Sequence, residues 1–355
     1  MLTKSQLILT SVVLLAVLVV MNLAMVYLTR NSVPRRVMRH ARESQSAGVL
    51  ALGNSLVAAG FDESAFDIGA RLSPPRGAAN LGLGASTPVE QILLFRYALS
   101  HGMRPRILIY GFYDFQLTVP IQLTTSELIG NHAMLYYVEP FYARRFYSLS
   151  LHDSFQFRAM HAIPMLADRG AIWAKVEILR RAFAQLGMPA ERTNRFGRAS
   201  DFSLLESDNS EDFRRQCEAS LDLQIAPPVN ELLRQAHDAG ITIAVVEMPM
   251  RGAHRNLFYD TACWPQYVAH VRDLLAPYNV IWVDASTWIQ DDSRFADPLH
   301  LSALGAAQFS NRLGSLLGTH YPNLSAQSDV ASGPGGTPVL DHPLHRAAWS
   351  QGRAH

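Results

Sequence analysis

The hydrophobic residues of the chain form one long uncharged run near its start and several short runs farther on. The long run extends from Gln6 to Leu28 and contains no charged residue. As a helix it would span about 34 Å, enough for a hydrocarbon core of about 30 Å. A secretory signal has a shorter apolar region and a small-residue cleavage site, and a buried core helix rarely lacks every charge. Residues 6–28 are therefore predicted to form an uncleaved transmembrane anchor.

Short apolar runs bounded by turn residues alternate with helical patterns in the rest of the chain. Such runs are typical of buried parallel strands. Helical spacing is clear from Pro88 to His101 and from Ser302 to Leu317. The alternation indicates an α/β fold whose parallel sheet has helices on both faces and binds ligands at the carboxyl ends of its strands. The expected strands are Gly48–Leu52, Ala78–Leu81, Arg106–Tyr110, Ile241–Val246 and Asn279–Val283.

The same pattern divides the chain into segments. Residues 29–47 are interpreted as a basic membrane-proximal linker, and residues 48–320 as one α/β domain. Residues 115–210 interrupt the alternation and are too long for a loop in a compact domain, so they are expected to form a mostly helical insertion. Residues 325–355 are polar and rich in Gly and Pro, which predicts a disordered tail.

Composition and charge narrow the function classes. The net charge is +1 and charged residues make up 17% of the chain, against a usual value of about 25%. This balance argues against a nucleic-acid partner bound by phosphate neutralisation. The two cysteines, Cys217 and Cys263, cannot form a disulfide framework or a Cys-based zinc site. They could form one bridge, which the sequence leaves open. No metal or cofactor is expected.

Arginines concentrate directly after the anchor. By the positive-inside rule they place the following domain in the cytoplasm. The same side chains could instead bind lipid headgroups on either face of the bilayer. These residues are Arg30, Arg35, Arg36, Arg39 and Arg42.

Two short motifs at predicted strand ends carry residues of hydrolytic chemistry. Ser55 follows the first strand in the turn Gly53-Asn54-Ser55, where a serine can expose its hydroxyl at the start of a helix. Asp297 and His300 lie near the end of the domain, and a carboxylate that orients a His is the usual partner of a serine nucleophile. The alternative roles are ordinary ones: a helix cap for Asp297 and a surface histidine for His300.

Other strand ends carry glycines and polar groups. The glycine-rich turn Asn80–Thr87 has neither a P-loop lysine nor a GxGxxG pattern, so nucleotide binding is disfavoured. Its backbone N–H groups could stabilise an oxyanion, or the turn could simply connect a strand tightly to a helix. Polar residues that could contact substrate, or lie in solvated loops, are Asn54, Asp114, Glu247, Arg251 and His254.

The order of these motifs resembles the SGNH (GDSL-type) hydrolase family. The matching blocks are Gly-x-Ser-Leu, Asn-x-Gly-x-Gly, Gly-x-x-Asp and Asp-x-x-His-Leu-Ser, spread from Gly48 to about Leu317. The resemblance implies a flavodoxin-like three-layer α/β/α fold and activity as an esterase, lipase or O-acyltransferase. It implies that Ser55 is the nucleophile, His300 the base and Asp297 its orienting group. Gly84, or Ala85 one residue on, would donate an oxyanion N–H beside that of Ser55.

Two blocks depart from the family pattern. Asn54 stands where the family has Asp, which keeps the nucleophile and a similar side-chain shape. Tyr113 stands where the family has an oxyanion-donating Asn, in Gly111-Phe112-Tyr113-Asp114. Loss of one oxyanion donor costs roughly 10²–10³ in rate. Tyr113 is therefore a candidate replacement donor, and its presence also raises the alternative of an impaired site.

The resemblance extends to membrane-anchored proteins of polysaccharide O-acetylation and teichoic-acid D-alanylation. It implies a single-pass protein of the bacterial inner membrane with an extracytoplasmic domain, which conflicts with the arginine count. It also implies an acylated carbohydrate or cell-envelope polymer as substrate, and a membrane-bound acyltransferase as partner. The first hypothesis is a serine esterase or O-acyltransferase that acts through an acyl-Ser55 intermediate. The second is a catalytically impaired binding or scaffold subunit of a polysaccharide-modifying or export assembly.

Overall fold

The computed structural model describes residues 3–72, 77–119, 150–163 and 210–321, together with residues 139, 142, 144–146 and 166. Most of the insertion predicted at 115–210 and the tail predicted at 325–355 lie outside these residues. Within the insertion, the described residues include a short 3-10 helix η1 (Phe115–Leu117) and the helix α9 (Leu151–Ala162), and helix α12 (Ser210–Ser220) begins at its last residue.

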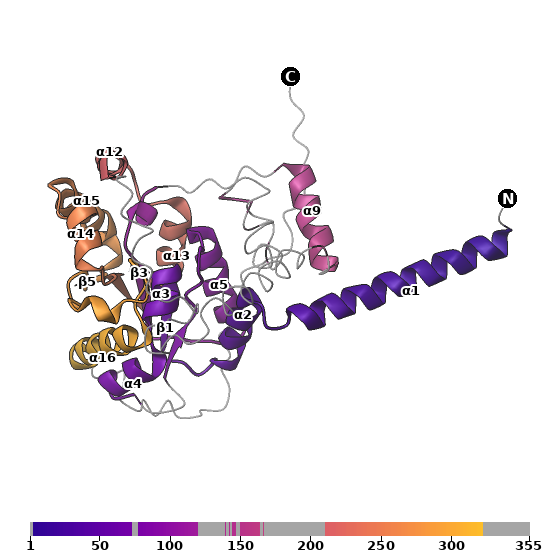
Figure 1. The fold of residues 1–355 in the computed structure, drawn as a ribbon, viewed down its shortest axis with the longest axis horizontal. Coiled ribbons are helices and arrows are strands. Elements are labelled where there is room, and N and C mark those ends of the chain that lie inside the picture. Colours follow the sequence, from indigo (N-terminus) through magenta and orange to yellow (C-terminus); the bar gives the residue numbers. More distant parts are fainter. Residues whose placement is uncertain are drawn as a thin grey trace, which may run out of the picture. The chain divides into compact units, whose positions relative to one another are not determined.

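A parallel sheet of five strands forms the centre of the domain (Figure 1). Its strand order is β2-β1-β3-β4-β5, and every neighbouring pair is parallel. This is the flavodoxin-like doubly wound order, in which ligands bind where the chain leaves β1 and β3 toward opposite faces. The predicted α/β class and parallel sheet are confirmed. The strands are β1 (Val49–Gly53), β2 (Ala78–Asn80), β3 (Ile107–Phe112), β4 (Thr242–Glu247) and β5 (Ile281–Asp284).

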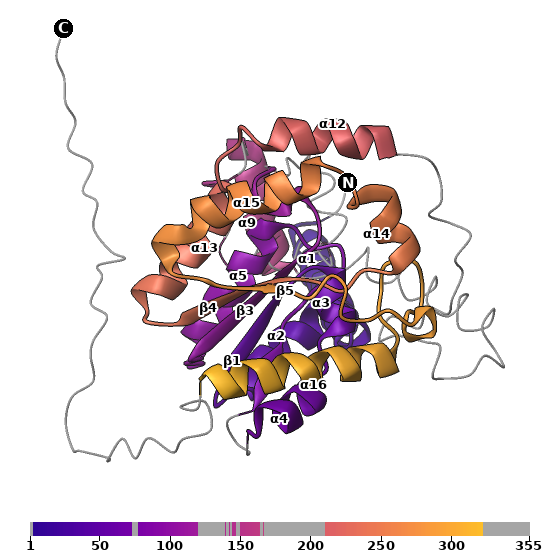
Figure 2. The same ribbon diagram turned by 90° about the vertical axis from the view of Figure 1, so that its left-hand side faces the viewer.

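Helices cover both faces of this sheet because successive side chains of each strand point to opposite sides. In β1, Leu50 and Leu52 belong to one buried cluster, whereas Val49 and Ala51 belong to the other. In Figure 2, α4 and α16 lie on one side of the strands, and α13 and α15 on the other. The first cluster packs against α5 (Pro88–Ser100), α13 (Pro227–Asp238) and α15 (Cys263–Leu275), and the second against α3 (Ser55–Gly60), α4 (Glu63–Ala70) and α16 (Ala303–His320).

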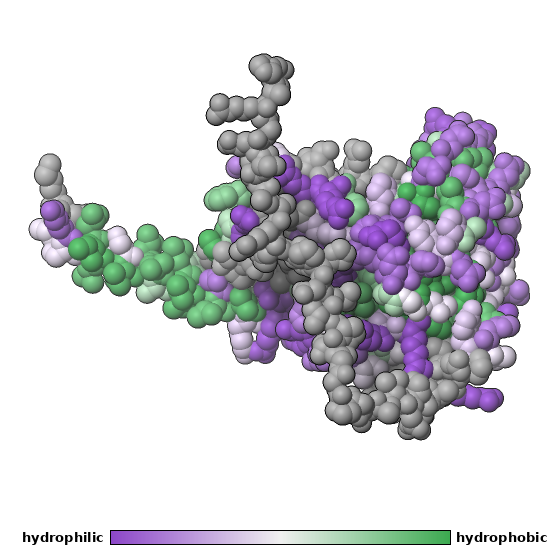
Figure 3. Space-filling view, turned by 180° about the vertical axis from the view of Figure 1, so that it is seen from behind, coloured by the Kyte–Doolittle hydropathy of each residue, from purple (hydrophilic) through white to green (hydrophobic). Residues whose placement is uncertain are grey.

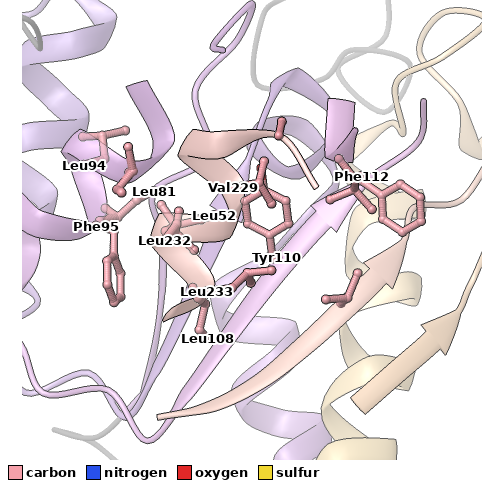
Figure 4. Close-up of a cluster of buried hydrophobic side chains, with 14 of the residues drawn as sticks. Leu52, Leu81, Leu94, Phe95, Leu108, Tyr110, Phe112, Val229, Leu232 and Leu233 are labelled. Carbon is pink, nitrogen blue, oxygen red and sulfur yellow. The ribbon is translucent and has the colours of Figure 1, made fainter. Parts of the chain in front are cut away.

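Large apolar side chains fill the layer between the sheet and α13. Figure 4 shows Leu52, Leu108 and Tyr110 of the sheet near Val229, Leu232 and Leu233 of α13. The Tyr110 hydroxyl is satisfied within this layer because it donates to Gln91 Oε1 at 2.5 Å. Because all the side chains named here are fully buried, the layer is closed to solvent.

The N-terminal region contains two helices. Helix α1 (Lys4–Thr29) has a mean hydropathy of 2.7 over its most apolar window and buries none of that window. It is long and apolar enough to cross a membrane, and its surface is almost wholly apolar in Figure 3. A buried core helix is therefore the wrong interpretation. The predicted linker contains a helix, α2 (Val33–Glu43), whose Val37 and Ala41 are buried in the first cluster.

Two glycines at the ends of β1 and β3 let α3 approach the sheet closely. Gly53 and Gly111 are register partners. A methyl group added to either glycine would overlap the Val57 side chain of α3. At Gly53 it would also lie 2.8 Å from the Gly111 carbonyl oxygen. This contact fixes the height of α3 above the sheet, and hence the position of its first residue, Ser55.

We expect Gly111→Ala to lower the free energy of unfolding by about 1–3 kcal/mol, because overpacking forces Val57 or the strand to move. Chemical denaturation of the purified protein measures this loss. Gly252→Ala is the matched control, since no atom lies within 4 Å of the added methyl group. Its effect should stay within about 0.5 kcal/mol, and equal stabilities of the two variants would contradict the packing account.

Candidate active site

Ser55 is placed by the turn that joins β1 to α3. Asn54 caps this helix, and its Oδ1 accepts the Leu56 N–H at 3.0 Å. The Asn54 amide group also donates to Gln116 Oε1 at 3.4 Å, and Gln116 in turn donates to the Gly111 carbonyl at 3.3 Å. Ser55 itself is half-buried. The predicted substrate contact at Asn54 is thus a helix cap that ties the ends of β1 and β3 together.

The glycine-rich turn after β2 is fastened beside the end of β1. The Leu83 N–H donates to the Gly53 carbonyl at 3.1 Å, and the Ser86 hydroxyl donates to the same oxygen at 3.3 Å. Asn80 is buried, and its amide group donates to the carbonyls of Val57 in α3 and of Phe61, the residue that follows this helix. These bonds hold the turn that contains Gly84 beside the end of β1, the strand that precedes Ser55. Gly84 itself is half-buried.

Ala85 follows in the left-handed backbone region, with φ of 56°. It is exposed, whereas Gly84 is half-buried. Of the two oxyanion candidates raised by the sequence, Gly84 is therefore the one nearer the protein interior.

Asp297 and His300 form a buried hydrogen-bonded pair. His300 Nδ1 donates to both carboxylate oxygens of Asp297 at 2.8 Å, and the backbone N–H groups of Leu299 and His300 donate to Asp297 Oδ1 at 3.0 and 2.8 Å. Burial alone would raise the pKa of the Asp297 carboxyl, but these hydrogen bonds and the charge of His300 hold the pKa below its ordinary value. The carboxylate is thus kept ionised and fixes the imidazole ring with Nε2 directed away from it.

The segment that carries this pair is held against α3 and α16. The Ala296 N–H donates to the His300 carbonyl at 2.8 Å, and Leu301 packs near Gly60 at the end of α3. Ser302 caps α16 by accepting the Gly305 N–H at 3.3 Å. Leu301, the residue after His300, thus lies near the end of α3 farther from Ser55. A hydrogen bond from Ser55 Oγ to His300 Nε2 stays a prediction.

A cavity of about 330 Å³ lies at the carboxyl ends of the strands, on the β3 side. Asp114, which follows β3, His254, which follows β4, and Leu299, the neighbour of His300, all line this cavity. Sequence reasoning missed the aromatic character of its wall, because the rings come from three separate segments. We call this space the aromatic cavity; its aromatic lining is Tyr113, Phe115, Phe213, Phe258 and Tyr259.

Tyr113 and Asp114 are neighbours in the lining of this cavity. The Tyr113 carbonyl accepts the Tyr259 hydroxyl at 2.5 Å. Burial is the main cause that raises the pKa of both Tyr113 and Asp114. The Tyr113 hydroxyl therefore keeps its proton, and its role as a replacement oxyanion donor stays a prediction.

The two other residues predicted to contact substrate, Arg251 and His254, have different surroundings. Arg251 forms an ion pair with Asp292, with 2.9 Å between Nη2 and Oδ2, at the start of α14 (Gly252–Phe258). His254 lines the aromatic cavity, and burial lowers its pKa to about 4, so its ring is neutral at physiological pH. Of these two, only His254 belongs to the aromatic cavity.

Glu247 occupies a second cavity, of about 310 Å³, between β4, β5 and α15. Its carboxylate accepts the Trp264 indole N–H at 2.9 Å, and Asp284 is its register partner on β5. Burial, followed by the charge of Asp284, raises the pKa of Glu247 to about 7. Within the described part of the chain, no group of three His, Cys, Asp or Glu residues could hold a metal ion.

We expect the stability of the protein to fall between about pH 4.5 and pH 7, because in this window the folded state keeps a proton on Glu247 that the unfolded chain has lost. The loss is on the order of 3 kcal/mol for a shift from 4.5 to about 7. Glu247→Gln should remove this fall and keep the acceptor for Trp264. Urea unfolding of both proteins at pH 4.5 and pH 8 measures it, and identical pH profiles would refute it.

The two cysteines are bonded. Cys217 of α12 and Cys263 of α15 form a disulfide with a Cα–Cα distance of 6.2 Å. The sequence left this pairing open, since 46 residues separate the partners. The bridge ties α12, which follows residues outside the described part, to a helix of the sheet's outer layer.

Comparisons with known proteins add little to this geometry. No protein-family model matches the chain. No curated protein matches it either. A solved structure of a "putative acylhydrolase" from Bacteroides fragilis NCTC 9343 resembles it with a TM-score of 0.34 and 9% sequence identity, over 77% of this chain and 86% of that chain. The function of the chain is therefore inferred from its own site.

Proposed function

We propose that this chain is a membrane-anchored serine esterase or O-acyltransferase of the SGNH type. The observation that carries the proposal is the buried, hydrogen-bonded Asp297–His300 pair. An ionised carboxylate that orients a His ring is what a serine nucleophile needs from its base. The two partners belong to the segment before α16, at the other end of the domain sequence from Ser55.

The proposed reaction has two steps. Ser55 Oγ attacks the carbonyl carbon of an ester while His300 Nε2 takes the hydroxyl proton, and the alcohol leaves with that proton. Water or a sugar hydroxyl then attacks the acyl-serine, with His300 again moving the proton. The N–H groups of Ser55 and Gly84 are the proposed oxyanion donors. An acylated carbohydrate or envelope polymer is the proposed substrate, by resemblance.

A binding or scaffold role is the second candidate. It is favoured by Tyr113, which stands where the family has an oxyanion-donating Asn and lines the aromatic cavity beside Asp114. With one fewer donor, the site would be slower by roughly 10²–10³ than a complete one. The same cavity would then serve to bind the polymer.

We further propose that the domain faces an oxidising compartment outside the cytoplasm. Disulfides persist in such compartments and are rare in the cytosol, where thiols are kept reduced. The Cys217–Cys263 bridge supports this orientation, whereas the arginines after α1 favour the opposite one by the positive-inside rule. Helix α1 is the proposed single-pass anchor.

A fluorophosphonate probe should label the wild-type protein at Ser55 and fail to label Ser55→Ala. His300→Ala should label at least about 10³-fold more slowly, since the hydroxyl would lack its base. Ser315→Ala, an exposed serine on α16, is the matched control and should label normally. Undiminished labelling of Ser55→Ala would refute the nucleophile assignment. Absence of labelling in the folded wild type would favour the scaffold role.

Topology can be tested in cells with a reporter fused after His320. A phosphatase that needs its own disulfides should be active at this position, and a reporter that works only in the cytoplasm should be inactive. Alkylation of Cys217 and Cys263 in intact cells should require prior reduction. The reverse reporter pattern, with both thiols reactive without reductant, would contradict an extracytoplasmic domain.

A further inference from the structure

Helix α12 forms one wall of the aromatic cavity. Phe213 and Gln216 line the cavity, and Cys217 beside them is fully buried and bonded to Cys263. The opposite face of the helix is exposed and charged. Its ion pairs, Arg214–Glu218 and Arg215–Asp212, lie within the helix.

The disulfide is a main constraint on this wall. Helix α12 has 11 residues, and isolated helices shorter than about 12–15 residues are marginal in water. Its inward face offers Phe213 and Cys217 to the apolar cluster, which is a small apolar area for a helix. Because Cys217 is one residue from Gln216, the bond to α15 also fixes the residues that line the cavity.

Phe213 is the residue of this wall that limits the cavity. Its ring centroid lies 4.7 Å from that of Phe115, 4.9 Å from that of Tyr259 and 5.5 Å from that of Phe258. These distances are those of favourable aromatic pairs. Removal of the ring would therefore enlarge the cavity on the α12 side.

The cavity adjoins the proposed reacting groups without sharing their hydrogen bonds. Leu299, which lines it, is the neighbour of His300, and Gln116 accepts from Asn54 beside Ser55. Asp297 and His300 are held by residues of their own segment. A change in α12 can thus alter the space next to the site and leave the pair in place.

The lining selects an uncharged group. It contains no Lys or Arg among the residues that the structure describes. Its histidine is neutral and the pKa of its carboxyl is raised, both because of burial. Apolar rings with a few amide and hydroxyl groups are typical of small-molecule pockets.

We propose that Phe213, held by the Cys217–Cys263 disulfide, sets the size of the uncharged substrate group that occupies the aromatic cavity. Phe213 is a specificity residue, and the disulfide is a positioning element. The inference rests on the proposed esterase or acyltransferase function only for the statement that the occupant is part of a substrate.

The test is a series of nitrophenyl esters from acetate to hexanoate. Phe213→Ala should raise the ratio of kcat/KM for hexanoate to that for acetate roughly tenfold or more, since a pocket discriminates about that strongly per methylene group. The Cys217→Ala/Cys263→Ala variant should shift the ratio in the same direction. Arg214→Ala, on the outer face of α12, should leave it unchanged. An unchanged ratio in both pocket variants, with normal circular dichroism, would overturn the proposal.

A second readout separates this proposal from the proposed function. The corresponding anilides are not readily cleaved, and their binding can be followed by tryptophan fluorescence, because the Trp264 ring lies 6.1 Å from that of Phe213. Phe213→Ala should strengthen binding of the hexanoyl anilide relative to the acetyl anilide roughly tenfold. If the wild type hydrolyses no ester, the enzymatic proposal fails while this binding result still decides the role of Phe213. Equal relative affinities in wild type and variant would refute that role.

Discussion

The whole site depends on the contact of Val57 with the bare backbone of Gly53 and Gly111. Parallel strands bring these glycines side by side, and the absence of two Cβ atoms lets α3 pack directly on the strand ends. Any residue larger than glycine would lift the helix, and Ser55 with it. The Asn54–Gln116 bond joins the same two strand ends from the polar side. The position of α3 and Ser55 at this edge of the sheet is thus set first by packing and second by hydrogen bonds.

The Asp297–His300 pair depends on a different kind of order. Its hydrogen bonds are local, within four residues, and include two backbone N–H donors that hold the carboxylate in its ionised form. The hydrogen bonds of such a motif form within its own segment, and the sheet determines only where that segment lies relative to Ser55. This explains why the motif was readable in the sequence, while its distance from Ser55 was not.

The fold was largely predictable, because apolar runs bounded by turn residues mark buried strands. The predicted strands agree with the observed ones to within about two residues. The interpretation of residues 29–47 as a linker missed α2, since arginines are its most frequent residues and only Val37 and Ala41 of this helix are fully buried. The aromatic cavity was missed for a related reason. Phe115, Phe213 and Tyr259 come together only after folding, and nothing in their local sequence marks them as neighbours.

Tyr113 and the disulfide show what a motif comparison leaves out. The comparison identified Tyr113 as a departure, but the hydrogen bond that its carbonyl accepts from Tyr259, 146 residues away in the sequence, forms only in the folded chain. The disulfide joins residues 46 positions apart. It supports the proposed extracytoplasmic orientation, which the arginines after α1 do not favour. Arginines near a membrane are worth about 1 kcal/mol each and act in either leaflet according to its lipids. A disulfide, in contrast, depends on the redox state of the compartment, so it bears more directly on the proposed extracytoplasmic orientation than the arginines do.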